Sequence, residues 1–262
     1  HGWSSMQGSL RVAGGMGKLI DCFEDALPAE KLMLNQKIER LVDAEDGIEA
    51  IGSDGEIVAR SKRIILALPP RVASTIGFEP ALPENAVRTM KSISTWMAGH
   101  AKFIAVYDAP FWRSNGLSGD VMSRLGPMVE IHDASDPRSD GGALFGFLGL
   151  PARVRAGQDQ MIIDACVAQL VRLFGEKARS PLGAYLQDWA FESETAIEAD
   201  HTPPPGHPNY CMPKDLSELW DGRLIFASTE VATQFGGFLE GALEAAENAS
   251  KLIANSKRDP RS

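Results

Sequence analysis

The amino-acid sequence lacks what a disulfide framework, a zinc site or a membrane span would require. Its 262 residues contain only three cysteines, Cys22, Cys166 and Cys211, far apart and outside any Cys-x-x-Cys or Cys/His spacing. Sparse cysteines without such spacing are typical of a reducing compartment, so we expect the cytoplasm and no metal ion. No apolar run approaches the roughly 20 residues of a membrane-spanning helix, so we expect no membrane segment.

Positive charge is also scarce. Lysine and arginine total 26 against 35 aspartates and glutamates, which gives a formal net charge of -9 at pH 7. A nucleic-acid partner would favour a basic surface that neutralises phosphates, so we expect none. A small substrate is not excluded, because a local pocket can differ in sign from the whole surface. The hydrophobic share of 44% supports a sizeable core, in one large domain or two small ones.

The apolar pattern predicts many short strands and a few helices. Helical spacing is found after a glycine turn, ending near Leu27, and at residues 84–92, 159–174 and 238–253. Strand-like runs occupy residues 38–42, 48–51, 57–59, 63–68, 99–107, 143–150 and 224–227. Two Asp-Gly pairs, at 46–47 and 54–55, favour tight hairpin turns between the early runs. We therefore predict a mixed fold, of α+β or α/β class.

The first glycine cluster does not fit either of two phosphate-binding motifs. A P-loop ending in Gly17-Lys18 would need glycine at Val12 and serine or threonine at Leu19. A Rossmann fingerprint through the same glycines would need a third glycine at Ile20. The cluster therefore indicates a turn that begins a helix.

Catalytic side chains form no recognisable hydrolase motif. The histidines are scattered, and neither a His-Glu-x-x-His pair nor a Gly-x-Ser-x-Gly elbow is present. Carboxylates cluster at Glu192, Glu194, Glu198 and Asp200, with uneven gaps on a predicted loop. This spacing favours a solvated acidic face over a glycosidase pair or a calcium site.

The segment from residue 226 to residue 249 carries the strongest functional signal. A predicted strand ends in Ser228-Thr229-Glu230, and a Gly236-Gly237 turn then leads into an alanine-rich helix. Such a turn lets the backbone pass close to a ligand, and the free N–H groups of a helix start suit an anion or an electron-rich carbonyl. The same residues also fit a plain strand-to-helix connection.

This segment resembles the C-terminal flavin motif of the FAD-dependent amine oxidases, the monoamine-oxidase-like family. The similar stretches read FASTE at 226–230 and FGGFLEGA at 235–242, with Ser228 in the place of the usual glycine. The resemblance implies a set of residues in contact with FAD or its immediate surroundings: Ser228, Thr229, Glu230, Gly237, Phe238 and Leu239.

Other patches are similar to the family in the same order along the chain. The turn from Arg11 to Met16 resembles a glycine turn near the substrate cavity, and Lys18 just after it would line the substrate side. Ile38 would contact the adenine from a hairpin. Trp189 matches a tryptophan that packs beside the flavin.

Lys102 is the candidate catalytic residue. It lies in Gly99-His-Ala-Lys-Phe-Ile-Ala-Val, which resembles the strand that carries the family lysine near flavin N5. The residue type alone suggests an exposed lysine at a strand edge, whereas its apolar neighbours favour a buried one. A buried ammonium must be paired or hydrogen-bonded, and a water shared with flavin N5 would meet that need. The resemblance implies a role in flavin reoxidation or imine hydrolysis.

Two departures from the family pattern follow Trp189. Counted from there without gaps, the covalent flavin cysteine of monoamine oxidases falls at Glu198, so we expect non-covalent FAD. One aromatic of the amine-facing pair falls at Ala199, and the other is retained as Phe238. We therefore place Lys18, Ala199 and Phe238 in the substrate site and leave the identity of the amine open.

The resemblance also implies a domain organisation. Residues 1–70 would belong to an FAD-binding domain, residues 71–215 would form a substrate-binding domain with a mixed sheet and flanking helices, and residues 216–262 would return to the FAD. The family's Gly-x-Gly-x-x-Gly motif would lie before His1. We therefore expect this chain alone to bind FAD poorly, and to form a homodimer or associate with the part that carries the motif.

The implied reaction is the oxidation of an amine. A hydride equivalent leaves the carbon next to the nitrogen for the flavin, the imine hydrolyses, and O2 reoxidises the flavin with release of hydrogen peroxide. Two alternatives stay open. One is a related flavoenzyme that acts on carbon–carbon bonds, similar to carotenoid desaturases or porphyrinogen oxidases. The other is a non-catalytic fragment that serves binding or assembly.

Overall fold

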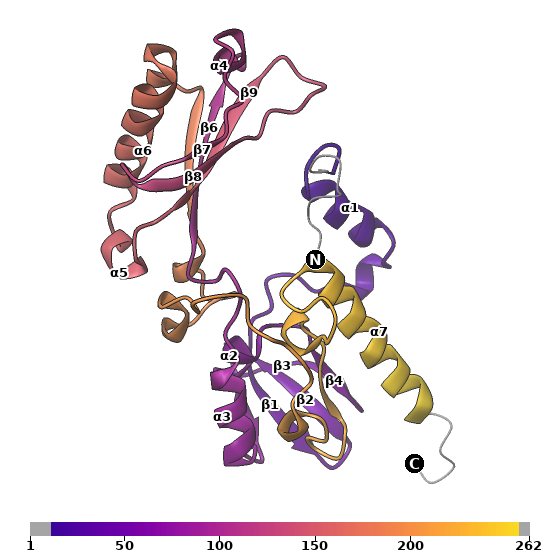
Figure 1. Ribbon diagram of the computed structural model, residues 1–262. Helices are drawn as coiled ribbons and strands as arrows, with labels where there is room; N and C mark the ends of the chain where they lie inside the picture. The colour runs from indigo at the N-terminus through magenta and orange to yellow at the C-terminus, as the bar shows by residue number, and fades with distance from the viewer. Residues whose placement is uncertain (1–11, 257–262) are drawn as a thin grey trace.

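A computed structural model describes residues 12–256, which form two lobes joined by two crossing segments (Figure 1). The lower lobe contains residues 38–92 and 214–256. The upper lobe contains residues 101–188. The combination of helices and sheets confirms the predicted mixed class. Arg11, and the ends of the proposed segments 1–70 and 216–262, lie outside the described residues.

The lower lobe begins with a four-stranded sheet in the order β3-β2-β1-β5. Its strands are β1 (Ile38–Ala44), β2 (Gly47–Gly52), β3 (Ile57–Ser61) and β5 (Gly77–Glu79). The pairs β1–β2 and β2–β3 are antiparallel, and β5 is parallel to β1. Gly47 has a φ of 132°, and a Cβ there would lie 2.7 Å from the carbonyl oxygen of Ser61, so the first Asp-Gly turn requires glycine. Both predicted hairpins are confirmed.

A second sheet in the lower lobe pairs strands from distant parts of the chain. In it β4 (Ile64–Leu66) runs parallel to β11 (Leu224–Phe226). Helices α2 (Pro70–Ala73), α3 (Glu84–Ser92) and α7 (Leu239–Ser256) surround the strands. The core that these elements share includes Leu41, Ile48, Leu66, Met90, Phe226 and Ala245.

The upper lobe is a five-stranded sheet with one covered face. Its order is β10-β6-β9-β8-β7, from β6 (Ala101–Tyr107), β7 (Val121–Met122), β8 (Met128–Asp133), β9 (Gly142–Leu148) and β10 (Gly183–Asp188). The helices are α4 (Phe111–Ser114), α5 (Ala152–Arg155) and α6 (Asp159–Phe174). Residues of β6 and β9 alternate between buried and half-buried, because α6 packs on one face only (Figure 1). The opposite face, which carries the predicted Lys102, is open because none of the helices within residues 12–256 covers it.

Helix α1 (Gly17–Asp25) follows the glycine turn as predicted, and none of its residues is buried. Short 3-10 turns complete the chain at Ala29–Lys31, Glu176–Arg179, Trp189–Phe191, Glu198–His201, Lys214–Leu216 and Thr229–Val231. None of the helices between residues 12 and 256 is long and apolar enough to cross a membrane.

Candidate functional site

Lys102 lies on the open face of the upper sheet, in the interior strand β6. Its ammonium is 4.8 Å from the ring centroid of Phe147 and 4.9 Å from that of Phe145, both on the neighbouring strand β9. The side chain is half-buried. A cation over two ring faces is attracted by their quadrupoles, so the rings hold the ammonium on this face. Lys102 is therefore not a lysine at a sheet edge.

A run of ring contacts leads from this face to the start of α7. The ring of Phe147 is 6.4 Å from His100, which is 6.4 Å from Trp96. The indole is in turn 5.0 Å from His207. The imidazole of His207 stacks on Phe238 with centroids 5.0 Å apart and planes 9° apart. The contacts thus join the predicted Lys102 and Phe238, which lie in different lobes.

Sequence reasoning missed three members of this group, Trp96, His100 and His207. Burial, and then the charge of Arg155, lower the pKa of His100 below its usual value, which favours the neutral ring. The backbone N–H of Trp189 donates to the carbonyl of His100 at 3.0 Å, which brings a predicted flavin neighbour beside the ring contacts. The available signal in the sequence was the density of aromatic and histidine residues next to the predicted strand at 99–107 and in the proline-rich stretch at 200–213.

The C-terminal motif folds back on itself through Thr229. Its hydroxyl donates to the carbonyl of Phe238 and accepts from the N–H of Gly237, both at 2.8 Å. Gly237 has a φ of 83°, and a Cβ there would lie 2.8 Å from Nε2 of His207; one on Gly236 would lie 2.5 Å from Cβ of Tyr210. The Gly-Gly turn is therefore required for the close approach of the chain to itself at His207 and Tyr210.

Two buried polar side chains of this motif have atoms without a partner. Ser228 is 6% exposed and Glu230 is 3% exposed, and the serine Oγ and the glutamate Oε2 make no hydrogen bond of normal geometry, although the serine side chain lies close enough to Glu230 to act on the pKa of its carboxyl. Burial raises the pKa of Glu230 above its usual value. Unsatisfied buried polar atoms are rare, because each costs free energy unless water or a ligand satisfies it. These atoms fit a ligand with polar groups, such as a flavin nucleotide.

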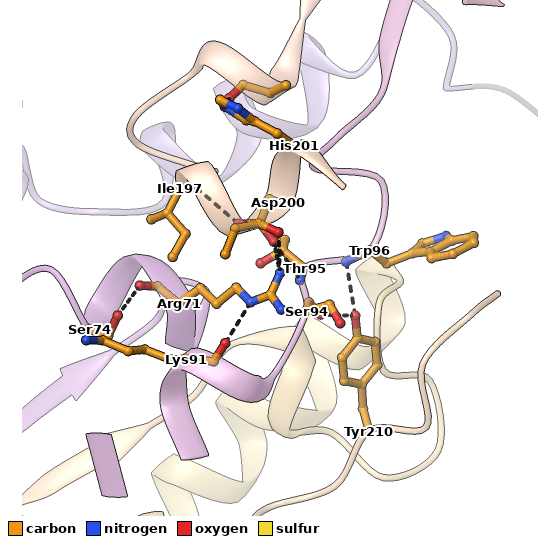
Figure 2. Close-up of polar contacts among 12 residues, drawn as sticks. Arg71, Ser74, Lys91, Ser94, Thr95, Trp96, Ile197, Asp200, His201 and Tyr210 are labelled. Atoms are coloured by element: carbon orange, nitrogen blue, oxygen red, sulfur yellow. Dashed lines mark hydrogen bonds and ion pairs between the residues drawn. The ribbon is translucent and has the colours of Figure 1, made fainter. Parts of the chain in front are cut away.

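Asp200 corrects one expectation from the sequence. The residue is 2% exposed and its carboxylate pairs with Arg71, with Nη1 and Oδ1 2.5 Å apart (Figure 2). The second carboxylate oxygen accepts from the N–H of Ile197 at 3.0 Å. The prediction of a solvated acidic face is wrong for this residue, because an arginine from a distant helix compensates its charge. The other three carboxylates, Glu192, Glu194 and Glu198, are exposed.

The remaining predicted residues occupy several places. Ile38 is half-buried at the start of β1, and Leu239 is 66% exposed at the start of α7. Ala199 is exposed, and its carbonyl accepts from Arg71 at 3.3 Å. Lys18 lies apart from these residues, on α1, where its ammonium pairs with Asp21 at 3.1 Å.

A histidine between two carboxylates marks the far end of the open face. His132 is 2.9 Å from Asp120 and 2.6 Å from Glu130, and its ring is 5.2 Å from Phe145. Burial alone would lower its pKa, but the hydrogen bonds and charges of Glu130 and Asp120 outweigh burial and raise it. In the part of the chain that the structure describes, no group of three or more histidine, cysteine or acidic residues is placed to hold a metal ion.

Comparisons of the sequence with a family model and with known proteins agree on one family. The family model described as flavin containing amine oxidoreductase matches residues 4–254. A probable flavin-containing monoamine oxidase A from Dictyostelium discoideum is 27% identical over 249 residues, which are 93% of this chain and 53% of the relative. A putrescine oxidase from Kocuria rosea is 28% identical over 206 residues, which are 71% of this chain and 41% of the relative.

Among solved structures, cyclohexylamine oxidase from Brevibacterium oxydans IH-35A superimposes with a TM-score of 0.74 at 25% identity. The match covers 93% of this chain and 53% of that one. The chain thus spans about half the length of the relatives it matches. With a match over nearly all of its residues, the chain belongs to the flavin containing amine oxidoreductase family.

Proposed function

We propose that this chain supplies the substrate-binding face and one wall of the flavin site of an FAD-dependent amine oxidase. The chain of side-chain contacts between Lys102 and Phe238 supports this proposal, because it connects the open face of the upper sheet with the C-terminal motif. In this proposal residues 71–215 form the substrate-binding domain, and residues 1–70 and 216–262 belong to the FAD-binding part. The upper lobe lies within residues 71–215, whereas residues 77–92 of the same stretch pack in the lower lobe.

FAD is the proposed cofactor, held without a covalent bond because the position of the family cysteine is Glu198. The unpartnered atoms of Ser228 and Glu230 support this choice. When bound, the flavin accepts a hydride equivalent from the carbon next to the amine nitrogen, and O2 takes the electrons away as hydrogen peroxide. The proposed cofactor contacts come from Ile38, Trp189, Ser228, Thr229, Glu230, Gly237, Phe238 and Leu239.

The side chains have separable roles in this proposal. Phe238 orients the amine, while the other rings exclude bulk water from its apolar part. Lys102 holds a water at its ammonium, which serves imine hydrolysis or the return of the flavin to its oxidised form. Ala199 leaves room beside the amine, and Lys18 is kept as a proposed substrate residue although it lies on α1, apart from the ring contacts.

Partners and compartment follow from the same proposal. The small-molecule partners are an amine and O2, and the chain works as a homodimer or together with residues that carry the dinucleotide motif. All three cysteines are free, which supports the cytoplasm as the compartment.

An amine panel tests the function. The full-length, flavin-loaded protein is incubated with a cyclic monoamine, a linear diamine and an L-amino acid, and hydrogen peroxide is measured. Peroxide with any of them supports the proposal, and the pattern of rates identifies the substrate class. Turnover of a carotenoid or porphyrinogen without peroxide release from any amine would overturn it in favour of carbon–carbon oxidation. The absence of turnover with all of these substrates, at full flavin content, would favour a binding or assembly role.

A further inference from the structure

Two segments of the chain cross between the lobes, residues 93–100 outward and residues 189–213 on the return. They approach so closely that a Cβ on Gly99 would lie 2.4 Å from the carbonyl oxygen of Asp200. Tyr210 on the return segment donates its hydroxyl to the carbonyl of Ser94 at 2.7 Å and accepts from the N–H of Trp96 at 3.0 Å (Figure 2). The two segments, which we call the bridge, are therefore bonded to each other.

Arg71 of α2 fastens the bridge to the lower lobe. Its Nε donates to the carbonyl of Lys91 at the end of α3, 2.9 Å away, and its Nη1 pairs with Asp200 at 2.5 Å (Figure 2). The same carboxylate oxygen accepts from the N–H of Thr95 at 3.5 Å. The arginine side chain is 13% exposed and the aspartate side chain 1% exposed. One ion pair thus holds both bridge segments against α2 and α3.

Arg155 of α5 fastens the other end of the bridge to the upper lobe. Its guanidinium pairs with Asp188 through two hydrogen bonds, of 2.6 and 2.7 Å, where the return segment begins. Its Nη2 also donates to the carbonyl of Gly99 at 2.9 Å, where the outward segment ends. The arginine side chain is 3% exposed. Bidentate pairs of this kind are geometrically specific as well as strong.

We propose that Arg71 and Arg155 are positioning residues that lock the bridge and so fix the separation between Lys102 in the upper lobe and Phe238 in the lower lobe. A buried arginine without its partner is costly, so each clamp restricts the bridge to one geometry. Only the kinetic consequence of this inference rests on the proposed function. A displacement of about 1 Å between reacting groups can reduce a rate on the order of 10²-fold.

The test measures the lobe separation directly. Spin labels are attached to Met161→Cys on α6 and Ile57→Cys on β3, two exposed positions in different lobes, after Cys22→Ser and Cys211→Ser remove the exposed native thiols. Double electron–electron resonance on the full-length, flavin-loaded protein gives the distance distribution. The variants are R71A, R71K, R155K and the matched control R223A. This control breaks the Arg223–Asp43 pair of the lower lobe, in which both N–O distances are 2.5 Å.

We expect one narrow distance population in the parent protein and in R223A. In R71A the population should broaden or shift, and in R71K and R155K the change should be in the same direction but smaller, because lysine retains the charge but loses the planar fork. If R71A does not fold, R71K and R155K decide the question. A narrow, unshifted distance in both lysine variants would overturn the inference.

Kinetics on unlabelled variants give the second readout. Broken clamps should lower kcat/KM for the best amine at least tenfold at unchanged flavin content, whereas R223A should not. If the parent protein oxidises no amine, the proposed function fails, while the distance distributions still decide whether the arginines lock the bridge. Unchanged kcat/KM in variants with broadened distances would refute the positioning role.

Discussion

The imidazole of His207 lies flat against the ring of Phe238, with centroids 5.0 Å apart and planes 9° apart. Removing the imidazole in H207A should raise the KM for the amine about 2- to 10-fold, because a ring pair contributes about 0.5–1.5 kcal/mol beyond its buried area. H207F keeps a ring and should stay near the parent value. Steady-state kinetics at equal flavin content check this.

A suitable control for the ring pair is F78A. Phe78 contacts Trp220 edge-on, with centroids 5.9 Å apart, within the lower lobe. Its loss should lower the free energy of unfolding and leave KM unchanged. An equal rise of KM in F78A and H207A would mean that His207 acts only through stability.

Replacing Lys102 by methionine should separate chemistry from folding. Methionine keeps the length and the contacts with Phe145 and Phe147 but removes the ammonium. We expect turnover to fall by about 10² to 10⁴-fold, the usual contribution of a positioned proton-transfer group, with flavin content unchanged. Stopped-flow measurement of the separate half-reactions should place the loss in reoxidation. Lys251 on α7, which is exposed and pairs with Glu247, gives the control K251M. Parent-like reoxidation and turnover in K102M would contradict the role of Lys102.

The three thiols should react very unequally. Cys166 is 0% exposed in the upper core, and burial raises its pKa to about 12, whereas Cys22 and Cys211 are exposed. Only a thiolate is an effective nucleophile, so iodoacetamide should label the two exposed cysteines and spare Cys166 until denaturant is added. Mass spectrometry of the tryptic peptides measures this. Rapid native labelling of Cys166 would show that the upper core opens.

Glu230 should make stability depend on pH. Burial, with a smaller effect of Asp200, raises its pKa above 4.5, so the folded protein holds this proton more tightly than the unfolded chain. The protonated side chain of Glu230 contributes fully to the free energy of unfolding below the pKa that it has in the unfolded chain. This contribution is lost as pH rises through the higher pKa that it has in the folded protein. E230Q should therefore match the parent protein near about pH 4 and exceed its free energy of unfolding near about pH 7. Urea denaturation at both pH values measures the difference.

Glu244 provides a control of opposite sign. Backbone N–H groups, chiefly that of Thr233, lower the pKa of its carboxylate. Its contribution is present above the unfolded pKa and is lost as pH falls through the folded pKa. E244Q should thus lower the free energy of unfolding near about pH 7 and have little effect in acid. The same pH trend in E230Q and E244Q would contradict the burial argument.

The sequence predicted correctly those elements whose own residues carry a complete helical pattern or turn motif. The predicted helices at 84–92 and 159–174 coincide with α3 and α6, and the Asp-Gly turns lie between paired strands. Strands β8 and β10 were missed. Polar residues such as Glu130 in β8 and Gln187 in β10 interrupt the apolar pattern, so these segments resemble loops in the sequence, whereas β6 and β9 carry mostly apolar residues on both faces.

The candidate site was predictable only in part, for a different reason. Lys102 and Phe238 could be predicted because each lies within a short sequence motif. Their connection depends on Trp96 and His207, which lie on segments that meet only after folding. Asp200 was misjudged for the same reason. Its partner Arg71 is remote in the sequence, so local spacing carries no information about the pair.

The parallel pairing of β4 with β11 sets the order in which the two lobes can fold during synthesis. Ile64, Ile65 and Leu66 leave the ribosome before the whole upper lobe, and their partners Leu224, Ile225 and Phe226 come after it. Until then an apolar strand edge stays unpaired, which is a hazard for aggregation. The upper lobe draws its sheet from one continuous stretch of chain, so it can fold while the lower lobe waits. A nascent-chain experiment should therefore find protease resistance first in the part of the protein that is translated second.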